Sequence, residues 1–114
     1  MKEKDNRLLQ SLIGELMKSE RKIWKKVAYE LSRPRKQRAE VNLSKIDAHA
    51  AENATVLVPG KVLASGAISK KATIAAFSFS GKAKELISAA GGKAITIDSL
   101  QKSNPEGKGV IILK

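Results

Sequence analysis

The chain has 114 residues, of which 22 are Lys or Arg and 11 are Asp or Glu, so its net charge is +11. This is the length of one domain, which buries roughly two-thirds of its unfolded surface. The absence of cysteine excludes disulfides, thiolate metal sites and thiol nucleophiles. The excess positive charge favours polyanionic partners, because each phosphate that a protein neutralises releases a condensed counterion.

Membrane insertion and secretion are not expected. No apolar run approaches the ~20 residues that a membrane span needs, and the charged N-terminus leads into no signal-peptide segment. We expect a soluble, cytoplasmic protein.

Two helices are predicted first. Over residues 6–19, with Asn6 as the N-cap, apolar residues recur at helical spacing: Leu9, Leu12, Ile13, Leu16 and Met17. Over residues 20–32 a second apolar face is formed by Trp24, Val27, Ala28 and Leu31. We expect both faces to be core.

Three lysines share a different face of the second helix. Lys22, Lys25 and Lys26 lie at i, i+3 and i+4, where like charges repel, and Glu30 alone lies four residues beyond Lys26. Either this face is simply solvated or it contacts phosphate.

Residues 33–38 form the densest basic cluster. Pro34 ends the helix, all five arginines lie within the first 38 residues, and residues 21–38 carry a net charge of +7. Guanidinium groups suit phosphate, so we predict an extended arm laid along a nucleic-acid backbone. The alternatives are a disordered basic linker and a nuclear-import-type signal.

The middle of the chain is predicted to contain a hairpin. Residues 40–43 form a strand, and Ser44 caps a helix over residues 45–51, in which His49 is a surface or boundary residue rather than a ligand or base. Residues 56–58 and 61–63 flank Pro59 and Gly60, a pair typical of tight turns. The pattern predicts strand, turn, strand, with a positive φ at Gly60 and Lys61 pointing outward.

The remaining residues alternate between strand and helix. A basic turn over residues 66–71 leads into a buried strand over residues 73–79. Ser80 caps a helix that Gly91 and Gly92 end, and a strand follows over residues 93–97. Asp98 caps a short helix to residue 103, a turn spans residues 104–107, and the last strand covers residues 110–113. The crossover predicts that the strands 73–79 and 93–97 are parallel neighbours, and the fold class is α/β.

Enzyme motifs are absent from the sequence. The Gly60-Lys61 pair lacks the glycine and the hydroxyl residue that a phosphate-binding Walker loop requires. There is no G-x-G-x-x-G, no nucleophile elbow and no cluster of His, Asp and Glu. We therefore expect no catalysis, cofactor, metal or small-molecule substrate.

Several stretches of the chain form a recognisable set: WKKVAYELSRPR at residues 24–35, VNLSKI at 41–46, VPGKVL at 58–63, Phe79-Ser80 and the NPxG at 104–107. Together, in this order and at this spacing, they resemble the eighteen-e family of the archaeal and eukaryotic large ribosomal subunit. The second half also resembles the bacterial fifteen protein, a distant relative, and the compact length suggests an archaeal member. The resemblance implies an irregular superhelix of β-β-α turns and a structural, rRNA-binding role beside neighbouring ribosomal proteins.

We interpret the chain as one domain, in which helices at residues 1–33 and a basic arm at 34–40 precede an α/β body at 41–114. RNA helices are recognised mostly by shape and backbone, and the few aromatic residues argue against base-stacking platforms. The alternatives are a DNA-compacting, chromatin-like protein and an RNA-directed enzyme, which would lack its catalytic groups. The candidate RNA-binding residues are Lys22, Lys25, Lys26, Arg33, Arg35, Lys36, Arg38, Lys45, Lys61, Lys70 and Lys71.

Overall fold

The computed structural model describes residues 3–114, with side chains from Arg7 onward apart from that of Arg35. The helices are α1 (Glu3–Met17), α2 (Lys22–Ser32), the 3-10 turn η1 (Arg35–Gln37), α3 (Leu43–His49), α4 (Gly81–Ala89) and α5 (Ile97–Ser103). The strands are β1 (Ala39–Asn42), β2 (Thr55–Leu63), β3 (Thr73–Phe79), β4 (Lys93–Thr96) and β5 (Val110–Ile112). The chain therefore has the predicted α/β class.

All pairings in the sheet are parallel. The strand order is β1-β2-β3-β4, and β5 also pairs with β2. Thr73 lies opposite Lys93 and Ala76 opposite Thr96, which confirms that the strands on either side of α4 are parallel neighbours. β2 and β3 are joined without an intervening helix, so β2, β3 and α4 form a β-β-α succession.

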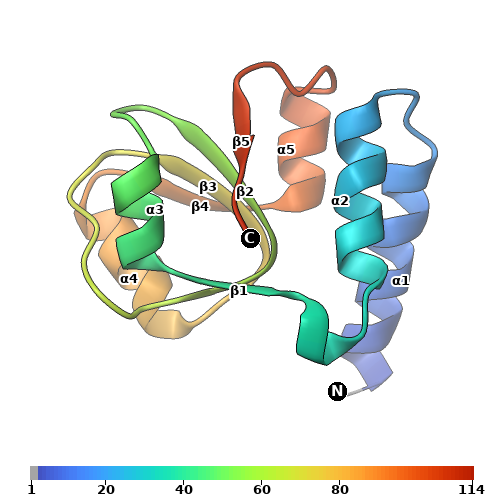
Figure 1. Ribbon diagram of the computed structural model, residues 1–114, viewed down its shortest axis with the longest axis horizontal. Coiled ribbons are helices and arrows are strands. Elements are labelled where there is room, and N and C mark those ends of the chain that lie inside the picture. Colours follow the sequence, from blue (N-terminus) through green and yellow to red (C-terminus); the bar gives the residue numbers. More distant parts are fainter. Residues whose placement is uncertain (1–2) are drawn as a thin grey trace.

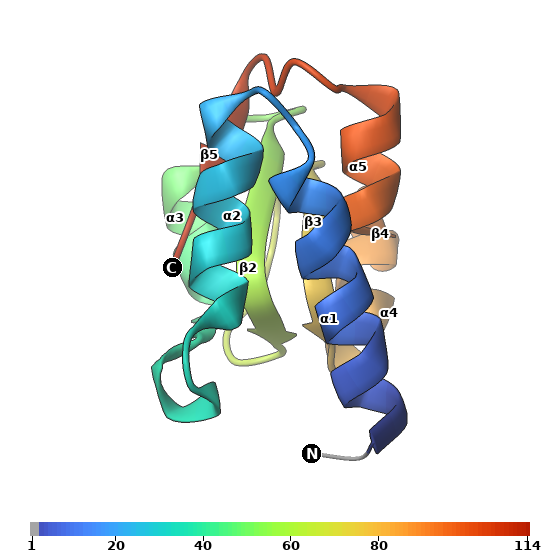
Figure 2. The same ribbon diagram turned by 90° about the vertical axis from the view of Figure 1, so that its right-hand side faces the viewer.

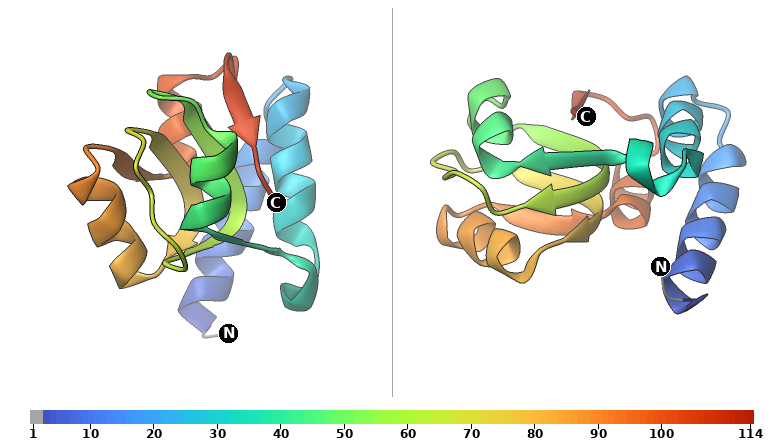
Figure 3. Two further views of the ribbon diagram at one scale, coloured as in Figure 1. Left: turned by 60° about the vertical axis from the view of Figure 1, so that its left-hand side comes forward. Right: turned by 60° about the horizontal axis from the view of Figure 1, so that its bottom comes forward.

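Helices cover the sheet on both faces (Figure 1). On one face, α3 and α4 enclose a core that includes Val58, Ile74 and Ile87. On the other, α1, α2 and α5 enclose a core that includes Leu16, Trp24 and Leu57. Figures 2 and 3 show these two layers from the side and from below. The sheet alternation explains the division, because successive residues of β2 and β3 point to opposite faces.

The predicted hairpin at Pro59 and Gly60 is wrong, because β2 runs unbroken through both residues. β1 pairs with residues 60–63 of β2, and β5 pairs with residues 55–57 on the same edge. Pro59 falls between these partners, where its missing N–H breaks no ladder. On the other edge, the register with β3 shifts between Val58 and Lys61, so the pair forms a bulge there. A Pro-Gly pair serves a bulge as well as a turn.

Several helix ends differ from their predicted positions. α1 begins at Glu3, so Asn6 lies within the helix rather than at its cap. Asn42, rather than Ser44, is the N-cap of α3, and Thr96, rather than Asp98, is that of α5. In each case the helix begins before the polar residue that we predicted as its N-cap.

Other predicted ends are confirmed. The side chain of Ser80 accepts a hydrogen bond from the amide of Ala83 at the start of α4. Gly91 follows the same helix with φ at 84°.

The indole of Trp24 is fully buried and donates to the carbonyl of Pro105 over 2.7 Å, so Trp24 is core as predicted.

Candidate nucleic-acid interface

A basic stripe runs along the outer face of α2. Lys22, Lys25 and Lys26 are exposed, while Trp24 and Leu31 on the opposite face are fully buried. Within residues 3–114, none of the three ammonium groups has a hydrogen bond or an ion pair. The mutual repulsion of these charges, a few tenths of a kcal/mol per pair, is therefore not balanced by the chain itself.

The segment that follows α2 is a compact turn, not the predicted extended arm. The amide of Gln37 donates to the carbonyl of Pro34 over 2.8 Å and closes η1. The fixed φ of proline suits the start of a turn as well as an extended chain. Lys36 is exposed and Arg38 is half-buried. The side chain of Arg35 lies outside the described residues.

Among the side chains that the structure describes, the Nε of Arg38 is the one buried nitrogen or oxygen atom without a hydrogen-bond partner. A buried N–H without an acceptor is costly.

A buried carboxylate organises the base of this segment. Glu30, 5% exposed, accepts a hydrogen bond from Nζ of Lys114 at 2.9 Å and one from Nη1 of Arg33 at 3.4 Å. Nη2 of Arg33 reaches Oε1 of Gln37 at 3.3 Å. Glu30 therefore balances the charges of Arg33 and Lys114. It does not pair with Lys26, the partner that its i+4 spacing had indicated. Arg33 joins α2 to η1.

The same contacts set the ionisation of Glu30. The hydrogen bond from Lys114 holds the pKa of this carboxyl below its usual value, against the raising effect of burial. Lys114 is held in turn, since its backbone oxygen accepts from Nζ of Lys45 at 2.6 Å. Lys45, a predicted RNA-binding residue, is exposed but forms this hydrogen bond with the protein itself.

The loop between β2 and β3, which carries Lys70 and Lys71, lies on the α3 side of the sheet, away from α2 (Figure 1). Nζ of Lys70 donates to the carbonyls of Asp47 and Ala50, both at 2.7 Å, and so satisfies the end of α3. The side chain of Lys71 is exposed, and its amide donates to Glu52 at 3.1 Å. Lys70 is a structural residue, and neither lysine joins the α2 stripe.

Asp47 fixes this loop to α3. Its carboxylate accepts from the amide and the hydroxyl of Ser69 at 3.0 and 3.1 Å and from the amide of Lys70 at 3.3 Å. The hydrogen bond from the Ser69 amide lowers the pKa of Asp47 most, and this lowering outweighs the desolvation that raises it.

Lys61 is exposed near the end of β2, as predicted, and lies opposite Glu40 of β1. β1 directly follows the basic turn and pairs with this part of β2, so Lys61 lies opposite the strand that continues from that segment. The structure therefore places six of the predicted cations along α2 and the turn that follows it, with Lys61 on the strand next to β1: Lys22, Lys25, Lys26, Arg33, Lys36 and Arg38.

The comparisons with known proteins identify the family. The family described as "Ribosomal protein 60S L18 and 50S L18e" matches residues 3–114. The chain belongs to this L18 and L18e family.

Close relatives of this L18e-family chain occur in archaea. "Large ribosomal subunit protein eL18" of Archaeoglobus fulgidus is 48% identical over 93% of this chain and 91% of the relative. The protein of the same name from Methanococcus maripaludis is 46% identical over 93% and 88%, and that from Methanoregula boonei is 45% identical over 98% and 96%. The family resemblance predicted from the sequence is confirmed.

Tyr29 is a surface residue that was not among the candidate RNA-binding residues predicted from the sequence. It is 63% exposed and lies on the lysine face of α2. The signal was in the spacing, because residue 29 follows residue 25 at i+4 and residue 26 at i+3, as residues 25 and 26 follow residue 22 at i+3 and i+4. Lys114, which no motif or spacing indicated, donates to Glu30 although the two residues are 84 positions apart in the chain.

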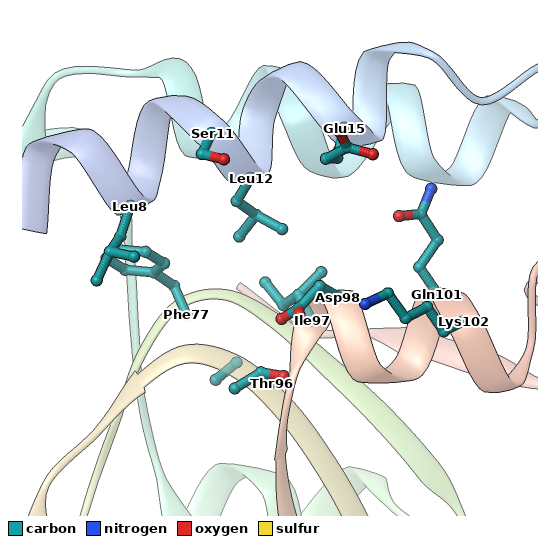
Figure 4. Close-up of a pocket in the computed structure, with 11 residues that line it drawn as sticks. Leu8, Ser11, Leu12, Glu15, Phe77, Thr96, Ile97, Asp98, Gln101 and Lys102 are labelled. Atoms are coloured by element: carbon teal, nitrogen blue, oxygen red, sulfur yellow. The ribbon is translucent and has the colours of Figure 1, made fainter.

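A cavity of about 340 Å³ lies elsewhere in this chain, between α1, α5 and β3. Figure 4 shows Leu8, Leu12, Phe77 and Ile97 around it, with Glu15 and Lys102 at its margin. The residues that line it include Ser11, Glu15 and Asp98 but no histidine. Among the side chains that the structure describes, no group of three His, Asp or Glu residues is placed to hold a metal ion. Within residues 3–114, no helix is long and apolar enough to span a membrane.

Proposed function

We propose that this protein is a structural constituent of the large ribosomal subunit that binds folded large-subunit rRNA through α2 and residues 33–38. The observation that carries the proposal is the stripe of Lys22, Lys25 and Lys26, exposed and unpaired within residues 3–114 on a helix whose other face is buried. Membership of the L18e family supplies the ribosomal context. No catalytic role is proposed, and the particle in which the protein works is cytoplasmic.

A rigid cationic face suits structured RNA. The backbone phosphates of RNA supply most of the affinity, while a helix that does not rearrange fixes the register of the contacts. α2 is held by its buried face and by the Trp24 bond to Pro105, so its lysines keep a constant spacing. Lys36, Arg38 and Lys61 extend the face toward β1, whereas Arg33, Lys45 and Lys70 form hydrogen bonds within the protein. Neighbouring ribosomal proteins are further partners that we expect.

Replacement of Lys22, Lys25 and Lys26 by Ala tests the interface. Each lost phosphate contact lowers the slope of log affinity against log salt by about 0.7–0.9. In filter binding with archaeal large-subunit rRNA, the slope of log affinity against log salt should therefore be smaller in magnitude by about two to three for the triple variant than for the parent. Its thermal midpoint should not fall, because the three side chains are exposed.

The matched control removes three exposed lysines from elsewhere on the surface: Lys84, Lys93 and Lys102. It changes the net charge equally, but its salt slope should stay that of the parent protein. Equal losses in the two triple variants would mean that only net charge matters and that α2 is not the interface.

A competition experiment separates the rRNA role from the chromatin-like alternative. At matched salt, the protein should prefer archaeal large-subunit rRNA to duplex DNA and should remain with large subunits through a high-salt wash. Equal affinity for both nucleic acids, with release on washing, would instead favour a DNA-compacting role.

A further inference from the structure

The most exposed large apolar side chain among the described residues of known exposure is also the one set within the basic stripe. Tyr29 is 63% exposed, more than Leu8, Met17 or Ile111. Its phenol has no hydrogen bond or ion pair within residues 3–114. A single exposed aromatic residue needs no explanation by itself. The position of this one, among cations, is what carries the argument.

The position of Tyr29 on α2 is fixed by its neighbours. Lys25 precedes it by four residues and Lys26 by three, so both lie beside it on one face of α2. The adjacent Ala28 and Glu30 are buried, which prevents the helix from turning to hide the ring. A rigid helix thus presents an aromatic ring beside two ammonium groups suited to phosphate.

Resting on the proposed function, we infer that Tyr29 is a stacking platform for an unpaired base of the bound RNA, while Lys25 and Lys26 hold the phosphates beside that base. Loops and bulges of RNA expose such bases, and aromatic rings between cations recognise them. The inference revises the expectation, drawn from the low aromatic content, that the protein has no such platform. One ring is enough when it lies in the interface.

The test compares replacements of Tyr29 by Phe, Leu and Ala in filter binding with archaeal large-subunit rRNA over a series of salt concentrations. Stacking needs a π-face but no hydroxyl, and an aromatic residue that stacks on one base contributes about tenfold in affinity. Tyr29→Phe should bind within about twofold of the parent, and Tyr29→Leu and Tyr29→Ala about tenfold more weakly. The salt slope should be unchanged in all three, because no phosphate contact is lost.

Each contrary result has a distinct meaning. If Tyr29→Leu binds as well as the parent, the site is merely apolar. If Tyr29→Phe is as weak as Tyr29→Ala, the hydroxyl makes the contact. If free rRNA binding is unaffected but the variants dissociate from washed large subunits, Tyr29 contacts a neighbouring protein. Any of these outcomes overturns the stacking inference and leaves the proposed function intact.

The proposed function fails on a separate measurement, namely a parent protein that does not prefer rRNA to duplex DNA. Folding is not a confounding factor for the Tyr29 series, since the ring is exposed. Equal thermal midpoints of the three variants and the parent will verify this.

Discussion

Gly60 is constrained by a neighbouring backbone rather than by its own dihedral angles. It is not among the described glycines with positive φ, so the positive φ predicted for a turn at Gly60 is wrong. A Cβ at this position would instead collide with the carbonyl oxygen of Ala39, its partner in β1. The close approach of the two strands is what requires a glycine here.

Gly60→Ala should therefore lower the free energy of unfolding by about 1–3 kcal/mol, as overpacking of an interior does. Chemical denaturation followed by circular dichroism measures the change. Gly14→Ala is the matched control, because nothing lies within 4 Å of a Cβ at Gly14 inside the helix α1. It should stabilise the protein by roughly 0.5–1 kcal/mol. A Gly60→Ala protein as stable as the parent would show that β1 can move away.

The segment at residues 33–38 contains cations with two different tasks. Arg33 is hydrogen-bonded to the buried Glu30 and to Gln37, whereas Lys36 is exposed and has no partner within residues 3–114. The two residues lie three positions apart, and their sequence context does not distinguish them. The difference is that Arg33 reaches the buried carboxylate of Glu30, whereas Lys36 does not.

Single replacements by Ala should separate these tasks. Arg33→Ala should lower the free energy of unfolding by about 1 kcal/mol, since the ion pair is partly exposed and Lys114 still balances Glu30. Lys36→Ala should leave stability unchanged and reduce the salt slope of rRNA binding by about 0.7–0.9. Thermal melting and filter binding of both variants measure the split. If Arg33→Ala alone reduced the salt slope, Arg33 would be a phosphate ligand.

Local patterns predicted most elements and missed contacts between distant residues. The apolar periodicity located α1, α2 and α4, and the cap at Ser80 was found because capping is local. The strand through Pro59 was missed because the gap between β1 and β5 on its edge is created by strands far away in sequence. The basic face of α2 followed from spacing alone, but the pairing of Glu30 with Lys114 depends on tertiary packing.

Stability of the whole molecule depends on two carboxylates on opposite sides of the sheet. Glu30 anchors the α2 layer to Lys114, and Asp47 anchors the β2–β3 loop to α3. Hydrogen bonds lower the pKa of both groups below their usual values. A carboxyl whose pKa is lower in the folded than in the unfolded state stabilises the fold above the unfolded pKa. It loses this contribution as the pH falls through the folded pKa.

The thermal midpoint should therefore be steady from neutral pH to about 5 and fall as the pH drops below about 4, where ordinary carboxyls titrate. Glu30→Gln and Asp47→Asn should each have a lower midpoint at neutral pH, and the difference from the parent should shrink in acid. Calorimetry at a series of pH values measures this. Glu85→Gln is the control, because Glu85 forms only an exposed pair with Lys82 at 4.0 Å. A constant difference at every pH would mean that shape rather than charge matters at these positions.

The edge of β2 that β1 and β5 share has a consequence for protein synthesis. β1 precedes β2 in the chain, whereas β5 emerges 47 residues after the end of β2. During translation, the amides and carbonyls on one side of the first half of β2 therefore lack their partner strand, β5, until it is synthesised. Open strand edges recruit other chains. We expect the nascent protein to be most prone to aggregation, and to benefit most from chaperones, just before Val110–Ile112 emerges and closes that edge.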